Sequence, residues 1–169
     1  MLNPFYVLKL KTGETLFAEI VEQNVDDIVV RRPMMVKSFQ YDDLREGLTL
    51  QSWVPFTDDE IFDIPLDIVY YMGELKEQFI KYYGSSMMRE DLTKLRERGF
   101  NRVKSGVPLS DIYQEILRQV KELGEDYSIK YGLSREESSQ MISGLAESTA
   151  EESELDFDEQ DMSGERTLH

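Results

Sequence analysis

The carboxylates best spaced for chemistry lie in one short stretch, Asp58, Asp59, Glu60 and Asp63. Carboxylate oxygens are the ligands that hard cations such as Ca²⁺ take in proteins. The stretch lacks the spacing and the central glycine of an EF-hand loop, so we interpret it as a solvated turn and predict no metal site. Paired carboxylates that carry out hydrolysis also need burial and opposed pKa shifts, and the sequence indicates neither.

The residue types on which most other catalysis depends are nearly absent. His169 is the only histidine, it is the last residue, and the chain has no cysteine. A chain terminus does not hold an imidazole in a catalytic geometry, and without cysteine there are no disulfides, thiolate zinc sites or cysteine nucleophiles. There is also no glycine-rich phosphate loop and no nucleophile elbow. We therefore predict a protein that is not an enzyme, with no catalytic residues and no cofactor.

Basic side chains gather in two places. Arg31 and Arg32, with Lys37 nearby, form the first and could meet phosphate or an acidic segment such as the chain's own tail. We favour an exposed strand pair there. The second is a stretch around Phe100 that could contact a nucleic-acid backbone, since Gly99 and Gly106 loosen the chain; it comprises Arg89, Lys94, Arg96, Arg98, Arg102 and Lys104. Acidic residues interleave with it, which favours an ordinary salt-bridged helix face.

The net charge of −15 is unevenly distributed along the 169 residues. Residues 1–84 carry eight basic and 15 acidic side chains, residues 85–123 carry eight and six, and residues 124–169 carry three and 13. A nucleic-acid binder normally needs a basic footprint, because releasing counterions from phosphates drives its affinity. Only the middle segment has one, so RNA is a partner that the charge disfavours, as it does an anionic membrane surface.

Composition and length indicate one compact domain with appendages. The chain is 40% hydrophobic, enough for a core, and has no apolar run approaching the roughly 20 residues that span a bilayer. Its first residues lack the basic and apolar regions of a secretory signal. We expect a cytoplasmic protein with no membrane partner.

Alternation of apolar and polar residues through residues 3–72 is typical of strands with one buried face. It predicts five strands, over residues 4–11, 15–23, 28–32 with a continuation over 34–39, 48–56 and 61–72. Thr12 and Gly13 form the first turn, residues 24–27 the second, and residues 40–47 are expected to be a loop. Pro33 would interrupt a ladder, so we expect a bend or bulge there. Five short strands with turns between them indicate a small antiparallel barrel.

After Gly73 the apolar period becomes helical. Helices are predicted over residues 74–83, stopped by Gly84, and over 87–98, capped by Ser85 and Ser86. A third begins near Pro108 and has a broad apolar stripe, and Ser134 with Glu137 forms a capping box for a fourth that runs towards residue 145. From residue 146 the chain is rich in Ser, Glu and Asp and is expected to be disordered. The predicted domains are thus a barrel over 1–73, a helical extension over 74–145 and an acidic tail over 146–169.

The barrel half resembles the Sm-like (LSm) family of small SH3-like barrels. The resemblance depends on the layout of strand, glycine turn, bent strand, Asp and strand in residues 8–14, 16–20 and 26–30. Residues 53–57 and 64–69 are similar to a branch of the family found in phage and marine environmental sequences. The resemblance covers residues 3–80 and implies an α+β fold with a five-stranded antiparallel barrel, and ring assembly.

The chain also departs from the family pattern. No helix precedes the first strand, the apolar-Arg-Gly-Asn/Asp motif near the last strands is absent, and Val29 and Val30 stand where the family has the Asn that binds RNA bases. The uridine pocket of the family therefore has no residues to carry over. The resemblance supports the fold more than RNA binding.

We therefore predict a non-enzymatic oligomeric adaptor or regulator that acts through protein contacts, by self-association as a ring or dimer or with a protein partner. Its interface is expected to use aromatic residues and the stripe of the third helix, namely Tyr82, Tyr83, Ile112, Ile116 and Val120. Leu155 and Phe157 could act as a peptide motif in the acidic tail. One alternative is an Sm-like RNA-binding regulator that uses the stretch over residues 89–104. The other is a phage structural component, in the host cytoplasm, which only the resembled branch suggests.

Overall fold

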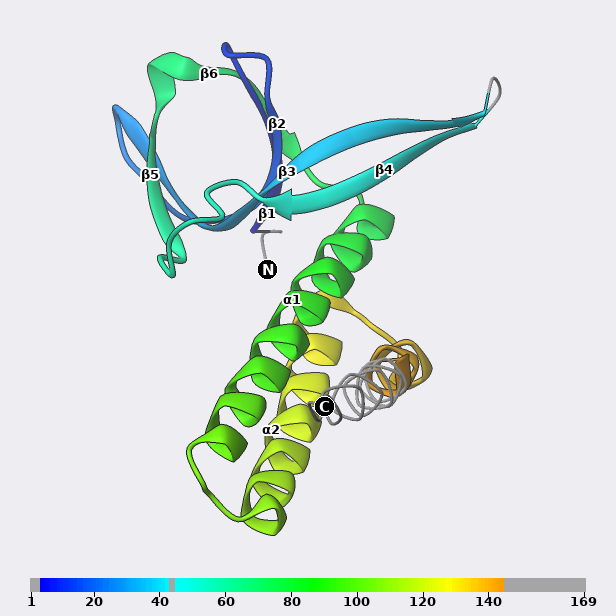
Figure 1. The fold of residues 1–169 in the computed structure, drawn as a ribbon. Coiled ribbons are helices and arrows are strands. Elements are labelled where there is room, and N and C mark those ends of the chain that lie inside the picture. Colours follow the sequence, from blue (N-terminus) through cyan, green and yellow to red (C-terminus); the bar gives the residue numbers. More distant parts are fainter. Residues whose placement is uncertain (1–3, 43–44, 145–169) are drawn as a thin grey trace, which may run out of the picture. The chain divides into compact units, whose positions relative to one another are not determined.

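The computed structural model describes residues 4–42 and 45–144 and confirms the α+β class, with an antiparallel sheet followed by helices (Figure 1). In chain order the elements are β1 Phe5–Leu10, β2 Thr15–Gln23, β3 Asp27–Asp42, β4 Arg45–Ser52, β5 Ile61–Pro65, the 3₁₀ turn η1 Leu66–Ile68, β6 Val69–Glu74, α1 Glu77–Lys104 and α2 Leu109–Tyr131. A further helix over residues 135–144 follows α2.

All strand pairs of the sheet are antiparallel, in the order β4-β3-β2-β1-β6, and β5 also pairs with β3. The long strand β3 serves two partners along one side. Its residues 27–31 pair with β5, and its residues 34–42 pair with β4. One edge of the sheet is therefore β6, and the other consists of β5 and β4 laid end to end along β3.

The change of partner in β3 occurs at Pro33, where the sequence predicts a bend or bulge. The register against β2 shifts there, since Phe17 pairs with Met34 but Glu19 pairs with Arg31. Arg32 has a positive φ of 46°, a conformation that costs a non-glycine residue about 1–2 kcal/mol. The predicted bulge is confirmed, although Pro33 does not end the strand.

Beyond Met35, β3 and β4 continue as a two-stranded arm that projects from the barrel (Figure 1). The sequence predicts a loop over residues 40–47, and this prediction is wrong at both ends, because Gln40 still pairs with Glu46 and Asp42 with Arg45. Arm residues from Lys37 to Gln40 are exposed, so the pairing at this end of the arm is held by the ladder rather than by burial of side chains.

The predicted fifth strand over residues 61–72 is two strands. Pro65 and the following turn η1 separate β5 from β6, and the chain leaves β3 and joins β1. The predicted fourth strand over residues 48–56 is displaced along the chain, because β4 begins at Arg45 and ends at Ser52, before Trp53. The Trp53 ring still packs against the core, at 6.0 Å from the ring of Phe62.

The barrel core is made from one face of β1, β2, β3 and β5, as the alternation along these strands predicts. Its fully buried members are Leu8, Leu10, Leu16, Ala18, Ile28, Val30 and Ile64. The first turn is also as predicted, since Leu10 N donates to Glu14 O at 2.9 Å and Gly13 has a φ of 101° that favours glycine. A single tight hairpin thus sets the β1–β2 register on which the core alternation depends.

The first turns of α1 pack on the outer face of the barrel. Phe79 lies 5.8 Å from Phe17, and Tyr83 lies 6.1 Å from Phe5, measured between ring centroids. The Tyr83 hydroxyl donates to the carbonyl oxygens of Arg31 at 3.2 Å and Arg32 at 2.8 Å. A residue from α1 therefore fixes the strained bulge of β3.

The two predicted helices over residues 74–83 and 87–98 form the single helix α1. Gly84 is buried within it, and the predicted caps Ser85 and Ser86 instead donate to the carbonyls of Lys81 and Tyr82, four residues earlier. Packing on both sides of these residues overrides the local stop signal. Gly99, predicted to end a helix, is also inside α1.

From residue 87 onward a helical unit is built around the α1–α2 hairpin. Leu92 and Ile112 are buried, and Gly99 lets the helices approach, because a β-carbon there would collide with the side chain of Ile116. The Tyr127 hydroxyl donates to Asp91 at 2.6 Å. Side-chain packing, rather than a backbone ladder, holds this unit together.

The predicted capping box is confirmed. Ser134 Oγ accepts from Glu137 N at 3.1 Å, and Glu137 Oε2 accepts from Ser134 N at 2.7 Å. The helix that follows packs on α2, where Ser138 and Ile142 lie beside Gly124. The predicted acidic tail over 146–169 lies outside the described residues. The chain divides into two compact units, at Ser86 and Met87.

Candidate functional site

The barrel unit has strand edges that are unpaired among the described residues. In the described residues, β5 pairs only with β3, and β6 pairs only with β1. Both strands also carry exposed apolar side chains, namely Ile61 on β5 and Tyr70 and Tyr71 on β6. An unpaired edge presents N–H and C=O groups to which another strand can bind.

The edge of β4 differs, because α1 covers part of it. The Tyr82 hydroxyl donates to the carbonyl oxygen of Leu48 at 2.6 Å. Trp53 N donates to Pro33 O, and the direction of the backbone groups alternates along a strand. The N–H and C=O groups of the odd-numbered residues of β4 therefore point towards β3, and the carbonyl of Leu48 points away from it. Tyr82, predicted at a protein interface, thus occupies an edge acceptor of its own chain.

The other residues predicted at an interface divide by burial. Tyr83, Ile112 and Val120 are buried within the chain, and Ile116 is half-buried against Gly99. The α2 side chains that are exposed lie beside this stripe. They are Leu109, Tyr113 and Leu117, which belong to the predicted apolar stripe of this helix but are not among the residues predicted at the interface. Helical periodicity alone does not show which flank of a broad stripe a partner helix covers.

Three of the six basic residues predicted for phosphate contact lie beside acidic side chains. Arg31 lies 3.6 Å from Glu19, and Arg32 lies 3.8 Å from Glu60. In the helical unit, Arg102 lies 2.6 Å from Glu115. This hydrogen bond and the charge of Arg102 together lower the pKa of Glu115.

The remaining predicted cations do not share one face of α1. Arg98 and Arg102 are one turn apart on one side, whereas Arg96 and Lys104 lie on other sides of the helix. Lys104 Nζ instead lies 4.5 Å from the centroid of the Phe100 ring. The structure thus brings Arg31 and Arg32 together at the bulge but spreads the other four around a helix.

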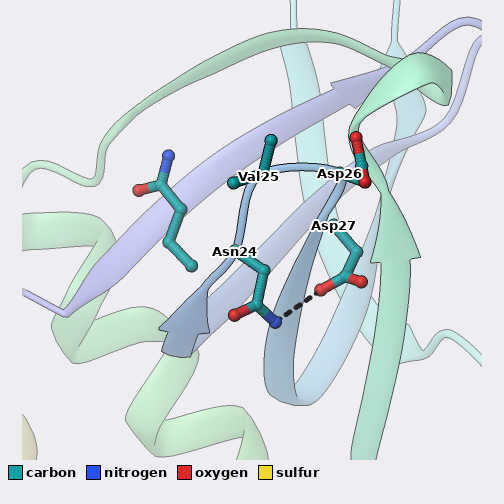
Figure 2. Close-up of a pocket in the computed structure, with 5 residues that line it drawn as sticks. Asn24, Val25, Asp26 and Asp27 are labelled. Atoms are coloured by element: carbon teal, nitrogen blue, oxygen red, sulfur yellow. Dashed lines mark hydrogen bonds between the residues drawn. The ribbon is translucent and has the colours of Figure 1, made fainter.

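A shallow hollow lies at the turn between β2 and β3, lined by Gln23, Asn24, Val25, Asp26 and Asp27 (Figure 2). Asn24 Nδ2 donates to Asp27 Oδ1 at 2.8 Å, and Asn24 N donates to Asp27 O at 2.9 Å. The polar groups of this turn therefore bind one another. The bonds between Asn24 and Asp27 do not indicate a ligand site in this hollow.

Within residues 4–42 and 45–144, no three His, Asp or Glu side chains are grouped so as to hold a metal ion. Asp59 and Thr57 bond to each other in the turn before β5, with Thr57 Oγ1 donating to Asp59 Oδ2 at 2.8 Å. None of the helices in the described part of the chain has the length and apolarity needed to cross a membrane.

Comparison with known proteins bears on the barrel unit. A family model described as Sm_like domain matches residues 7–84, which extend from β1 into the first turns of α1. The match supports an Sm-like fold for residues 7–84. The resemblance inferred from the sequence is confirmed, whereas its phage-type branch stays a prediction. No curated protein matches the chain.

The match fits the geometry of the Sm-like barrel. It ends at Gly84, so it includes Phe79 and Tyr83, the α1 residues that cover the outer face of the sheet. Sm-like domains are generally non-enzymatic binding modules that often self-associate and bind RNA or proteins. The helical unit after residue 86 lies outside the match.

Proposed function

We propose that the Sm-like barrel assembles with copies of itself through the edges of β5 and β6 and works as a non-enzymatic oligomeric adaptor that binds other proteins. The observation that carries this proposal is the pair of open edges on opposite sides of one sheet. Pairing β6 of one copy with β5 of the next is a head-to-tail contact, and such contacts close into a ring when the rotation allows.

The outward hydrogen-bonding groups can be assigned from the ladder. Leu75 N donates to Phe5 O, so the N–H groups of Met72 and Glu74 point away from β1, because the direction alternates along a strand. Leu66 N donates to Asp26 O, so those of Ile61 and Asp63 point away from β3. Pro65 follows with no N–H, which limits pairing to the first part of β5.

The charges of the barrel support protein contacts over RNA. Arg31 and Arg32 are paired with Glu19 and Glu60, and residues 1–84 carry 15 acidic side chains against eight basic ones. A protein with this balance gains little from counterion release on a phosphate backbone. A surface that binds other proteins does not depend on counterion release for its affinity.

The test is the mass in solution by light scattering after size exclusion, with the absorbance ratio at 260 and 280 nm read on the same peak. We expect an oligomer with a protein spectrum. Glu74→Pro removes an outward N–H without touching the β1 ladder and should dissociate the oligomer. Glu74→Ala loses the same side chain but keeps the N–H, and should not.

Two results would overturn the proposal. A monomeric wild-type chain at every concentration would exclude assembly through the edges. An oligomer with excess absorbance at 260 nm that disappears on nuclease treatment would make the chain an RNA-binding regulator, the alternative that the family brings.

A further inference from the structure

An uncovered apolar surface lies at one end of the α1–α2 hairpin. We name it the hairpin patch; its members are Phe100, Val103, Leu109, Tyr113 and Leu117. Leu109 is 69% exposed, Tyr113 61% and Phe100 55%. Apolar side chains scattered singly on a surface are ordinary, but five on neighbouring turns of two packed helices mark a surface that binds something.

The central members share one side of the hairpin. Gly99 faces α2, and Ile112 and Ile116 face α1. Phe100, Tyr113 and Leu117 each come one residue later, and a step of about 100° in two antiparallel helices turns both sets to the same side. The ion pair between Arg102 and Glu115 lies on the other side. The patch is therefore one surface.

The same side of α2 is already covered further along by the helix over residues 135–144. Ser138 Oγ lies 3.5 Å from Ser128 Oγ, and Ile142 lies beside Gly124. Positions 113, 117, 124 and 128 all fall on this side by helical periodicity. The hairpin patch thus continues a strip of α2 whose other end is packed against the chain's own last described helix.

The last described helix meets α2 within reach of the patch. Ser138 and Ile142 both lie beside Gly124, and Ser138 also lies near Ser128. Leu117 is seven residues beyond Gly124, about 10 Å along the helix. Eleven extended residues after Gly144 span up to about 36 Å, so the segment around residue 155 reaches every part of the patch.

The chemistry of this segment, which lies outside the described residues, complements the patch. Residues 145–169 contain nine acidic side chains and one arginine, with Leu155 and Phe157 as an apolar pair. The patch lies within residues 85–123, where basic side chains outnumber acidic ones, and Lys104 Nζ lies 4.5 Å from the Phe100 ring. Opposite charges at the rim of an apolar contact favour this partner over others.

We propose that the hairpin patch is the docking surface for this chain's own segment around Leu155 and Phe157. The two side chains pack on Tyr113 and Leu117, and the flanking carboxylates face Lys104. The docked segment competes with outside acidic peptides for the same surface. The proposal does not depend on assembly through the barrel edges, because all of its residues lie in the helical unit or after it.

Disulfide trapping in the full chain tests the docking, because the natural chain has no cysteine. The test pair is Leu117→Cys with Phe157→Cys. The matched control is Ile129→Cys with Phe157→Cys, since Ile129 is 85% exposed, turned away from the patch, and about as far from Gly124 along α2. Circular dichroism of the reduced proteins checks that both variants fold.

In a glutathione redox buffer we expect the test pair to form an intramolecular disulfide with an effective concentration roughly tenfold or more above the control. Lys104→Glu should lower that value several-fold, and Lys11→Glu, the same charge change on the barrel, should not. Equal values for the two pairs would overturn the proposal. Disulfides that link two chains in dilute protein would also overturn it, because a second copy would then supply the segment.

Discussion

The barrel unit and the helical unit leave different groups open to a partner. In the barrel, the core side chains are sealed, with Leu8, Leu16 and Ile64 fully buried, and the open groups are backbone N–H and C=O on β5 and β6. In the helical unit the backbone groups between the helix ends bond within their own helix, and the open groups are side chains such as Tyr113 and Leu117. One chain thus offers two unlike binding chemistries.

The difference follows from how each secondary structure satisfies its backbone. A strand needs a neighbour on both sides, so a sheet that does not close leaves edges whatever its side chains are. A helix needs none, so its contacts depend on which side chains a partner covers. Backbone pairing suits assembly of identical copies, and the apolar patch suits a short peptide segment.

The largest expected effect comes from opening the barrel core. Ile64→Ala should lower the free energy of unfolding by about 2–5 kcal/mol, because it removes buried methylenes and leaves a cavity. Trp53, the only tryptophan, reports on the barrel, and the circular dichroism at 222 nm reports on the helices. In Ile64→Ala we expect the midpoint of the fluorescence transition to shift to a lower urea concentration than the midpoint of the dichroism transition.

The control for this prediction is Ile61→Ala, on the same strand but with an exposed side chain, which should change the free energy of unfolding by less than about 1 kcal/mol. If both signals move together for Ile64→Ala, the two units unfold as one and their comparison as separate bodies fails.

The second effect tests the close approach of the helices. The Cδ1 methyl of Ile116 can turn aside for a single β-carbon, so the test uses Gly99→Leu, which places a whole side chain between the helices and should destabilise the helical unit by about 1–3 kcal/mol. Gly144→Leu is the matched control, because nothing lies near that position and leucine favours a helix over glycine by up to about 1 kcal/mol. Thermal unfolding followed at 222 nm measures both. A neutral Gly99→Leu would mean that the hairpin tolerates a wider spacing.

The third effect separates two neighbouring tyrosines of α1. Tyr83→Phe removes the hydroxyl that donates to the carbonyls of Arg31 and Arg32 at the strained bulge, and should cost about 1–3 kcal/mol because Tyr83 is buried. Tyr82→Phe frees only the exposed Leu48 carbonyl, which water can satisfy, and should cost less. Urea unfolding followed by Trp53 fluorescence measures the difference. If the two variants lose the same free energy of unfolding, the hydrogen bonds from Tyr83 do not stabilise the bulge.

Sequence reasoning succeeded where a local rule and the tertiary structure agree. Thr12 and Gly13 form the predicted hairpin, Pro33 lies at the predicted bulge, and Ser134 with Glu137 forms the predicted capping box. Each of these signals acts within a few residues. The alternation in β1 and β2 also identified the core residues, because a strand with one buried face alternates apolar and polar residues whatever its neighbours are.

It failed where distant residues decide the outcome. Gly84 is a local stop signal, but the packed surroundings keep α1 continuous through it. The five-strand count missed the division at Pro65, because the short turn η1 between β5 and β6 is mostly apolar, and only the change of partner from β3 to β1 marks it. The apolar stripe of α2 was predicted, but not which of its flanks stays exposed, since the flank that is covered depends on Gly99 in another helix.

The smallest expected effect is the pH dependence of the Arg102–Glu115 pair. The hydrogen bond from Arg102 and its charge lower the pKa of Glu115 from its ordinary value of 4.5. A carboxyl whose pKa is depressed on folding stabilises the folded state fully above its unfolded pKa, and this contribution is lost as the pH falls through the folded pKa. We therefore expect the stability advantage of the natural chain over Glu115→Gln to be present at pH 7 and to disappear in acid below 4.5.

Exposure keeps this effect small, because solvent and salt screen both groups. Arg102→Gln should remove the same pH dependence, and the double variant should add nothing to it, since the two residues act as one pair. Dichroism unfolding curves of the four proteins from pH 7 to acid measure the difference. If the stability of Glu115→Gln depends on pH as that of the natural chain does, other carboxylates of the hairpin are responsible. The Arg102–Glu115 pair would then not be the source of the effect.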